Sequence, residues 1–274
     1  MTLARSISAV VASLALICAL VPGASAVEIV AAGDIATSGP GDTRTSNLII
    51  ALDPRRVLTL GDNAYDRGTY SQFERLYDPT WGRFRGRTWP SPGNHDWETP
   101  GAAGFERYFR TRAGRLHRHV AGAWLIVSMD SQVAVARQRA RLRKVLRKDE
   151  HPCELLYWHK PRYSSGEHGN SRRVEGWWEV AARSGVELVL NGHDHDYERF
   201  AIRRGIREIV VGTGGAPTRP FNRPRPGSVK RLTGDSNWGV LDLTLKRDSY
   251  SGRFRRATGG TGTVADSFSG RCSS

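Results

Sequence analysis

Four short apolar segments of this chain each end in glycine and a side chain that can bind a metal ion. The segments run into Gly33-Asp34, Gly61-Asp62, Gly93-Asn94-His95 and Asn191-Gly192-His193. Short apolar runs bounded by turn residues predict buried strands. Ligand-type residues at four strand ends are therefore expected along one edge of a sheet, the edge where open α/β sheets carry their sites.

The polar residues at these strand ends provide oxygen and nitrogen donors and no thiolate. Such donors suit hard or borderline metal ions, not copper(I) or an iron–sulfur cluster. The donors are too many for one tetrahedral ion, so we expect two ions that share a bridging carboxylate. The set comprises Asp34, Asp62, Tyr65, Asn94, His95, His159, His193 and His195.

In type and order, these motifs resemble those of the metallophosphoesterase (calcineurin-like) superfamily and, within it, the purple acid phosphatases. The resemblance covers residues 33–199 and implies an α/β fold, a four-layer αββα sandwich of two packed mixed sheets flanked by helices. The motifs are Gly33-Asp34-Ile35, Gly61-Asp62-Asn63-Ala64-Tyr65, Gly93-Asn94-His95-Asp96, Leu156-Tyr157-Trp158-His159 and Gly192-His193-Asp194-His195, followed by Asp196-Tyr197-Glu198-Arg199.

The first motif distinguishes branches of that superfamily. Most members carry a metal-binding histidine where this chain has Ala36, and Tyr65 is expected to replace it with a phenolate suited to ferric iron. The resemblance implies two metal ions, Fe(III) and a divalent ion (Fe, Zn or Mn). Their expected ligands are Asp34, Tyr65 and His195 for iron, Asn94, His159 and His193 for the divalent ion, and Asp62 as the bridge.

Two further histidines are expected to contact the substrate. His95 resembles the phosphate-contacting histidine of the family, and His168 resembles a second one. The implied reaction is that of an acid phosphatase, a hydrolase that cleaves phosphate monoesters by attack of a metal-bound hydroxide. His95, helped by His168, would hold the phosphoryl group and protonate the leaving group.

Two alternatives to this function stay open. One is a phosphodiesterase with the same dinuclear centre, and the other is a non-catalytic basic protein that binds anions at the cell envelope. Taken singly, each motif also has an ordinary structural interpretation, because the side chain of an aspartate after a strand often forms a hydrogen bond with the backbone of its own turn. The ordered set favours the enzyme.

Strands alternate with helices along the chain, as in an α/β sandwich. Helices are expected over 47–52, capped by Ser46, and over 132–148 and 174–183, while 217–237 and 257–271 are expected to be polar loops. Strands are expected over 27–32, 56–60, 123–129, 155–158, 186–190, 208–211, 238–245 and 250–256.

Residues 1–26 have the pattern of a secretory signal peptide. A single charge, Arg5, precedes an apolar run over 7–21, and Ala24-Ser25-Ala26 provides small residues for cleavage. The rest of the chain, 27–274, is expected to form a single catalytic domain with no membrane span. The expected location is extracellular or at the cell envelope, and the extra N-terminal β-domain of larger relatives is expected to be absent.

Cys153 and Cys272 are the two cysteines outside the signal segment. In an oxidising compartment an even pair favours a disulfide, here one that would anchor the C-terminus. The alternative is two buried thiols.

The composition is basic, with 41 Lys+Arg against 27 Asp+Glu and a net charge of +14. Hydrophobic residues are 39% and charged residues 25%, which excludes a disordered chain and a multi-span membrane protein. The expected helix over 132–148 is rich in arginine and is expected to expose its charges, with Val135, Leu142, Val145 and Leu146 toward the core. No nucleic-acid motif is present. The expected partners, small phosphorylated substrates, are those that the resemblance to the metallophosphoesterases implies.

Overall fold

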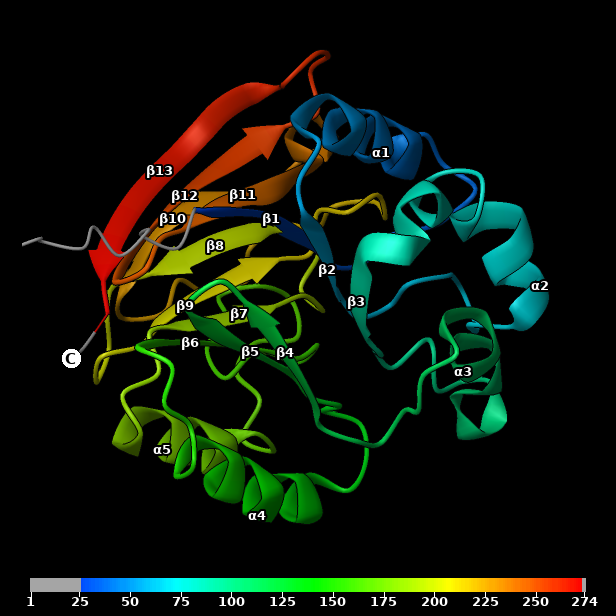
Figure 1. The fold of residues 1–274 in the computed structure, drawn as a ribbon. Coiled ribbons are helices and arrows are strands. Elements are labelled where there is room, and N and C mark those ends of the chain that lie inside the picture. The colour runs from blue at the N-terminus through cyan, green and yellow to red at the C-terminus, as the bar shows by residue number, and fades with distance from the viewer. Residues whose placement is uncertain (1–25, 273–274) are drawn as a thin grey trace, which may run out of the picture.

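The computed structural model describes residues 26–272 and contains two mixed β-sheets packed face to face (Figure 1). The first sheet has the order β13-β12-β11-β1-β2-β3 and the second β10-β8-β9-β7-β6-β5-β4. The strands are β1 (Val27–Ala32), β2 (Arg56–Leu60), β3 (Thr88–Ser91), β4 (His117–Ala121), β5 (Trp124–Ser128), β6 (Cys153–Tyr157), β7 (Leu188–Asn191), β8 (Tyr197–Phe200), β9 (Arg207–Val211), β10 (Ser228–Leu232), β11 (Gly239–Leu245), β12 (Ser249–Arg256) and β13 (Thr263–Arg271).

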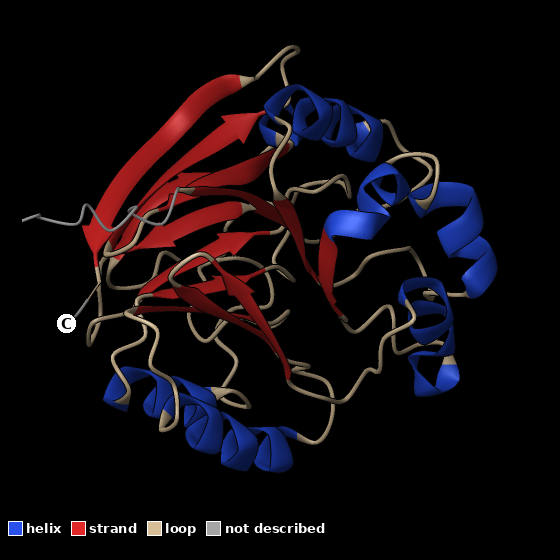
Figure 2. Cartoon of the chain, in the orientation of Figure 1, coloured by secondary structure: helices blue, strands red, loops and turns tan. Residues whose placement is uncertain are grey.

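Helices cover the outer face of each sheet, so the expected four-layer αββα sandwich is confirmed (Figure 2). α1 and the helical turn Trp81–Arg87 pack against the first sheet, α2 and α3 pack against each other, and α4 and α5 lie on the second sheet. The α-helices are α1 (Gly41–Leu52), α2 (Tyr70–Gln72), α3 (Ala103–Phe109), α4 (Val135–Leu146) and α5 (Glu175–Arg183). Short turns of other helix types cover Phe73–Tyr77, Trp81–Arg87, Pro100–Ala102 and Asp235–Asn237.

Strand alternation builds two hydrophobic layers from one strand. On β5, Trp124 and Ile126 face the layer between the sheets, while Leu125 and Val127 face the layer beneath α4 and α5. Successive strand residues point to opposite faces, and a strand covered on both faces is apolar throughout. This accounts for the continuous apolar runs that predicted the central strands.

The parallel strands set the position of the site. β1, β2 and β3 run parallel in the first sheet, and β5, β6, β7 and β9 run parallel in the second. The two sheets meet at the carboxyl ends of these strands, where the Gly33 amide donates to the carbonyl oxygen of Val211 at 2.9 Å. Segments that follow strands of either sheet therefore converge.

The predicted strands and the two later helices match the structure to within three residues, but three expectations are wrong. α1 begins at Gly41, and Ser46 lies inside it, where its hydroxyl donates to the Thr43 carbonyl instead of capping a helix. The expected loops over 217–237 and 257–271 contain β10 and β13, which pair with β8 and β12. α3, β4 and β8 were not predicted.

A disulfide joins Cys153 and Cys272, as expected. Cys153 begins β6 in the second sheet, and Cys272 directly follows β13 at the edge of the first sheet. The bond therefore connects the two sheets.

The expected signal peptide, residues 1–26, lies outside the described part of the chain except for Ala26. Among residues 26–272, none of the helices is long and apolar enough to span a membrane.

Candidate metal centre

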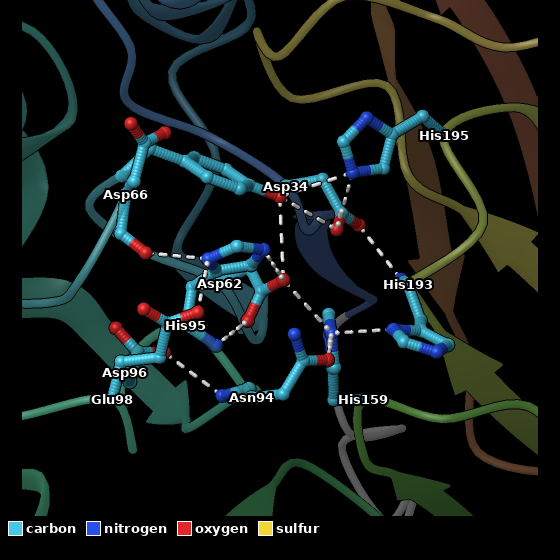
Figure 3. A network of polar contacts seen from close by, with 12 residues as sticks. Asp34, Asp62, Asp66, Asn94, His95, Asp96, Glu98, His159, His193 and His195 are labelled. Atoms are coloured by element: carbon cyan, nitrogen blue, oxygen red, sulfur yellow. Dashed lines mark hydrogen bonds and ion pairs between the residues drawn. The ribbon is translucent and has the colours of Figure 1, made fainter.

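Five strand ends deliver the predicted ligands to one place. Asp34, Asp62 and Asn94 follow β1, β2 and β3 of the first sheet, and His159 and His193 follow β6 and β7 of the second. Their side chains point toward one another in Figure 3, and His195 joins them from the segment after β7. All seven predicted metal ligands lie together, because both sheets present their carboxyl ends at this edge.

Three of these residues have left-handed backbone conformations that non-glycine residues rarely adopt. The φ angles are +59° at Asp34, +49° at Asp62 and +74° at His193. Each such conformation costs about 1 kcal/mol or more, and backbone strain of this kind gathers at functional sites. At these positions it turns the side chain inward as soon as the strand has ended.

The glycines before the ligands are required by close packing. A Cβ at Gly61, whose φ is +95°, would lie 2.5 Å from Nδ1 of His159. A Cβ at Gly93 would collide with Oδ1 of Asp62. Any side chain at either position would push a ligand out of place, which explains why ligand-type residues here follow glycine.

The first group of donor atoms surrounds the hydroxyl of Tyr65. Its Oη lies 3.1 Å from Oδ1 of Asp34, 3.3 Å from Oδ2 of Asp62 and 3.1 Å from Nε2 of His195. Nδ1 of His195 donates to the carbonyl oxygen of Pro217 at 2.8 Å. In a neutral His195, Nε2 therefore carries a lone pair that faces the group. These are the four residues predicted around the ferric ion.

The second group surrounds Nε2 of His159. This atom lies 3.2 Å from each of Oδ2 of Asp62, Oδ1 of Asn94 and Nδ1 of His193. The Asp62, His159 and His193 ligand atoms all lie within 4.8 Å of one another. Oδ2 of Asp62 therefore belongs to both groups, which is the position that a bridging carboxylate needs.

A metal ion fits the second group better than protons do. Nδ1 of His159 donates to the Leu60 carbonyl at 2.9 Å, so its Nε2 is the atom left for the site. A proton on Nε2 can serve only one of the three acceptors around it at a time, whereas a cation attracts all of them. A histidine whose second nitrogen donates to a backbone carbonyl is also the usual arrangement of a metal ligand.

Electrostatics set how tightly protons compete for these ligands. Burial alone would raise the pKa of Asp62, but the charge and hydrogen bond of His159 hold it below its usual range. Burial disfavours the charged form of His159, yet Asp62 raises its pKa to about 9. Burial, with the charges of Asp34 and Asp62, raises the pKa of Tyr65 well above its usual value. A metal ion must therefore displace protons from His159 and Tyr65.

The two histidines predicted to contact substrate lie beside different ligands of the centre, His95 beside Asp62 and His168 beside His193. Nδ1 of His95 donates to the Asp66 carbonyl and lies 3.3 Å from the Glu98 carboxylate, so its Nε2, 3.9 Å from Asp62, faces the site (Figure 3). His168 is exposed and stacks on the ring of His193, with 4.2 Å between centroids. Both rings are therefore within reach of a ligand at the centre.

Arg219 is a candidate functional residue that sequence reasoning missed. Its Nη1 donates to Glu167 at 3.0 Å and lies 3.4 Å from Nε2 of His168, and it lines a cavity of about 200 Å³ with Tyr65 and His95. The residue lies in an arginine-rich loop without a motif, so no sequence signal distinguished it from its neighbours.

Asp194 was also missed as a positioning residue, although it lies inside the Gly192–His195 motif. Its carboxylate accepts hydrogen bonds from the Ser164 hydroxyl and from the His168 amide, the latter at 2.7 Å. Asp194 therefore fixes the loop that carries His168. His117, His119 and His151 are half-buried residues outside this constellation, and His119 stacks on Trp89.

Comparison with known proteins agrees with this fold. The sequence model of the family described as Calcineurin-like phosphoesterase matches residues 14–197. No curated protein matches the chain.

Three solved structures illustrate the shared fold. A purple acid phosphatase from yellow lupin (Lupinus luteus) seeds matches with a TM-score of 0.76 and 19% identity, over 90% of this chain and 54% of that one. GAP50, the anchor in the inner membrane complex of Plasmodium, matches with a TM-score of 0.76 and 12% identity, over 91% of this chain and 90% of that one. A dimetal phosphatase from Danio rerio matches with a TM-score of 0.58 and 11% identity, over 92% of this chain and 100% of that one.

This chain spans about half the length of the lupin phosphatase. At these identities the likeness concerns the fold, whereas the family match covers most of the chain and the segments that carry the ligands. The chain belongs to the calcineurin-like phosphoesterase family.

Proposed function

We propose that this protein is an exported phosphohydrolase that holds two metal ions and hydrolyses phosphate monoesters. The observation that carries the proposal is the arrangement of seven donors in two groups that share Oδ2 of Asp62. A shared carboxylate between two groups of ligands is what two-metal phosphatases require. The family membership supports the reaction class, phosphoester hydrolysis.

A ferric ion would be held by Asp34, Tyr65 and His195. A divalent ion would be held by Asn94, His159 and His193, and Asp62 would bind both ions. When bound, the two ions would supply a nucleophile from water near neutral pH and offset the charge of the phosphoryl oxygens. Tyr65 favours ferric iron in the first position, because a phenolate is a hard donor that suits a highly charged cation.

His95 is the proposed proton donor to the leaving group. The Asp66 carbonyl and the Glu98 carboxylate occupy its Nδ1 and fix the ring, so a proton on Nε2 points into the site. Without that fixed orientation the ring could rotate out of reach of the leaving oxygen.

His168 and Arg219 are proposed to bind the phosphoryl oxygens from the side of His193. They lie side by side at the rim, and Glu167 orients the Arg219 guanidinium through its 3.0 Å contact. A monoester dianion gains more from the Arg219 guanidinium than a diester monoanion does, which favours monoesters over diesters.

Export is part of this proposal. Its supports are the signal-like pattern of residues 1–26 and the Cys153–Cys272 disulfide, because disulfides persist in oxidising compartments. Mass measurement of the protein recovered from the medium or envelope should give a chain that starts at Val27.

Phosphate release from an aryl phosphate by metal-loaded protein tests the reaction. The wild-type protein and the exposed-site control Asp53→Asn should be active, whereas Asp62→Asn should lose at least about 100-fold in kcat/KM. Preference for the matching bis-aryl phosphate would replace the monoesterase with the phosphodiesterase. Absence of release with any metal pair would favour a protein that only binds anions, a use of the fold other than catalysis.

A further inference from the structure

A second cavity, larger than the one at the metal centre, lies between the segment after α3 and the helix α4. Its volume is about 540 Å³, against about 200 Å³ at the metal centre, and the two cavities share no lining residue. Its lining residues are Arg112, Gly114, Arg115, Leu116, His117, Arg137, Gln138 and Arg141.

Four arginines line this cavity, and no acidic residue does. Arg112 and Arg115 come from the loop, and Arg137 and Arg141 come from successive turns of one face of α4. In the described part of the chain, none of the four forms an ion pair, although exposed arginines elsewhere do, such as Arg204 with Glu179. Like charges at i and i+4 repel, so this arrangement is unfavourable until an anion occupies it.

Two acidic residues next to the loop are engaged with its backbone. Glu106 accepts the Ala113 amide at 3.0 Å, and Asp130 accepts the Gly114 amide at 2.7 Å. Asp130 also accepts from the indole of Trp97 at 2.9 Å. These carboxylates hold the loop in shape and leave the arginines without a counter-ion.

The floor of the cavity is preorganised. Gln138 is buried, and its amide bonds to both backbone groups of Asp130 and to the Val133 carbonyl. Leu116 is buried beside it, and Nε2 of His117 donates to the Arg112 carbonyl at 2.8 Å. Loop and helix are thus fixed relative to one another, so the backbone positions that carry the four arginines need little rearrangement when a ligand binds.

We propose that this cavity binds an oligophosphate, a chain of two or more linked phosphate groups. Guanidinium groups bind phosphate oxygens in pairs, and four of them match a ligand with three or four negative charges better than a single phosphate. The chain can be inorganic or the end of a nucleoside polyphosphate, since the shared chemistry is the phosphate chain. The binding does not depend on the proposed hydrolysis.

Two charge-matched double variants test this proposal. Arg137→Ala/Arg141→Ala removes two charges from the cavity, and Arg139→Ala/Arg143→Ala removes two from the same helix next to a different hollow that Glu179 lines. The probe is a methylene-bridged triphosphate that cannot be hydrolysed, titrated calorimetrically against the full mature protein at low and moderate salt. Binding at the metal centre is common to all three proteins, so the difference between the variants reports the cavity.

The cavity variant should lose at least about tenfold in affinity and part of the salt dependence, while the matched variant binds like the wild type. Arg112→Ala/Arg115→Ala should repeat the loss from the loop side. Circular dichroism and thermal unfolding must show that every variant folds. A bridged nucleoside triphosphate in a second arm tells an inorganic chain from a nucleotide.

Four outcomes would overturn the proposal. If the two helix variants lost the same affinity for the triphosphate, the ligand would be responding to a diffuse positive field. The same would follow if the cavity variant lost as much affinity for a single-stranded oligonucleotide as for the triphosphate. Equal affinity for citrate or sulfate would show that the cavity does not select phosphate chains. Unchanged affinity in the cavity variants would place all binding at the metal centre.

Discussion

At the scale of single residues, Asp62 connects the two halves of the candidate centre. Its Oδ2 lies 3.3 Å from the Tyr65 hydroxyl and 3.2 Å from Nε2 of His159, and its Oδ1 accepts the His95 amide at 2.8 Å. Asp34, by contrast, contacts the Tyr65 side only, apart from accepting the His193 amide. The two carboxylates are therefore unequal, although both follow a glycine at a strand end.

This inequality predicts different metal contents for two conservative variants. Asp62→Asn weakens both groups of donors and should leave little metal, whereas Asp34→Asn weakens one and should retain about half of the wild-type metal. Elemental analysis of the purified variants, with kcat for an aryl phosphate, measures the difference. Equal metal retention in the two variants would contradict the bridging role of Asp62.

Tyr65 predicts a visible signature. A phenolate bound to ferric iron absorbs visible light by charge transfer, so iron-loaded protein should be violet or pink and Tyr65→Phe should be colourless while still folded. Visible spectra of both proteins, recorded with near-UV circular dichroism as the folding control, make the test. A colourless, iron-free and fully active wild type would rule out the ferric assignment.

At the scale of elements, the edge strands and the disulfide hold the sheets together. β13 is exposed along most of its length, and Cys272 directly after it is bonded to Cys153 on β6. The bond closes a sequence separation of 119 residues, so it removes much of the freedom of the unfolded chain.

Replacing both cysteines with serine should lower the free energy of unfolding by about 4 kcal/mol. Denaturant unfolding of the double variant and the wild type provides the measurement. Thiol titration of an unfolded, unreduced chain of residues 27–274 should find no free thiol. A double variant as stable as the wild type would show that the disulfide adds nothing to stability.

Glu154 on β6 predicts a pH dependence of stability. Burial, followed by the charges of Glu187 and Asp149, raises its pKa from 4.5 to about 8. The folded state then holds a proton that the unfolded state releases, so the stabilisation is complete below pH 4.5 and is lost as the pH rises to about 8. Glu154→Gln keeps a neutral group and should show a smaller drop in Tm over that range.

Thermal unfolding at several pH values measures this drop, with the exposed Glu150→Gln as the control. The control should follow the wild-type curve. If Glu154→Gln also follows it, the Glu154 carboxyl titrates in the folded state as it does in the unfolded chain.

At the scale of the whole molecule, the net charge of +14 sets how anions approach. A positive field speeds the encounter with multiply charged anions, and salt screens it. For an aryl phosphate, kcat/KM should therefore fall as salt is added, through a rise in KM at constant kcat. Steady-state kinetics at low and moderate ionic strength measure this, and an equal fall in kcat would show that salt acts on the reaction itself.

The apolar runs of the sequence predicted the central strands, and the resemblance of its motifs to the metallophosphoesterases implied the αββα architecture and the set of candidate metal ligands. These features depend on local patterns: buried strands need continuous apolar runs, and ligands such as Asp34 and Asp62 need glycines beside them for close packing. The pairing of Cys153 with Cys272 followed in the same way from cysteine number.

Other features depend on contacts between residues far apart in the chain. β13 and β10 look like polar loops because edge strands are partly exposed, and only their pairing with β12 and β8 makes them strands. Arg219 lies beside His168, although the two residues are 51 positions apart in the chain. Four arginines from two elements line one cavity. The local sequence does not predict which exposed arginines face one another, because their arrangement depends on how the loop after α3 packs against α4.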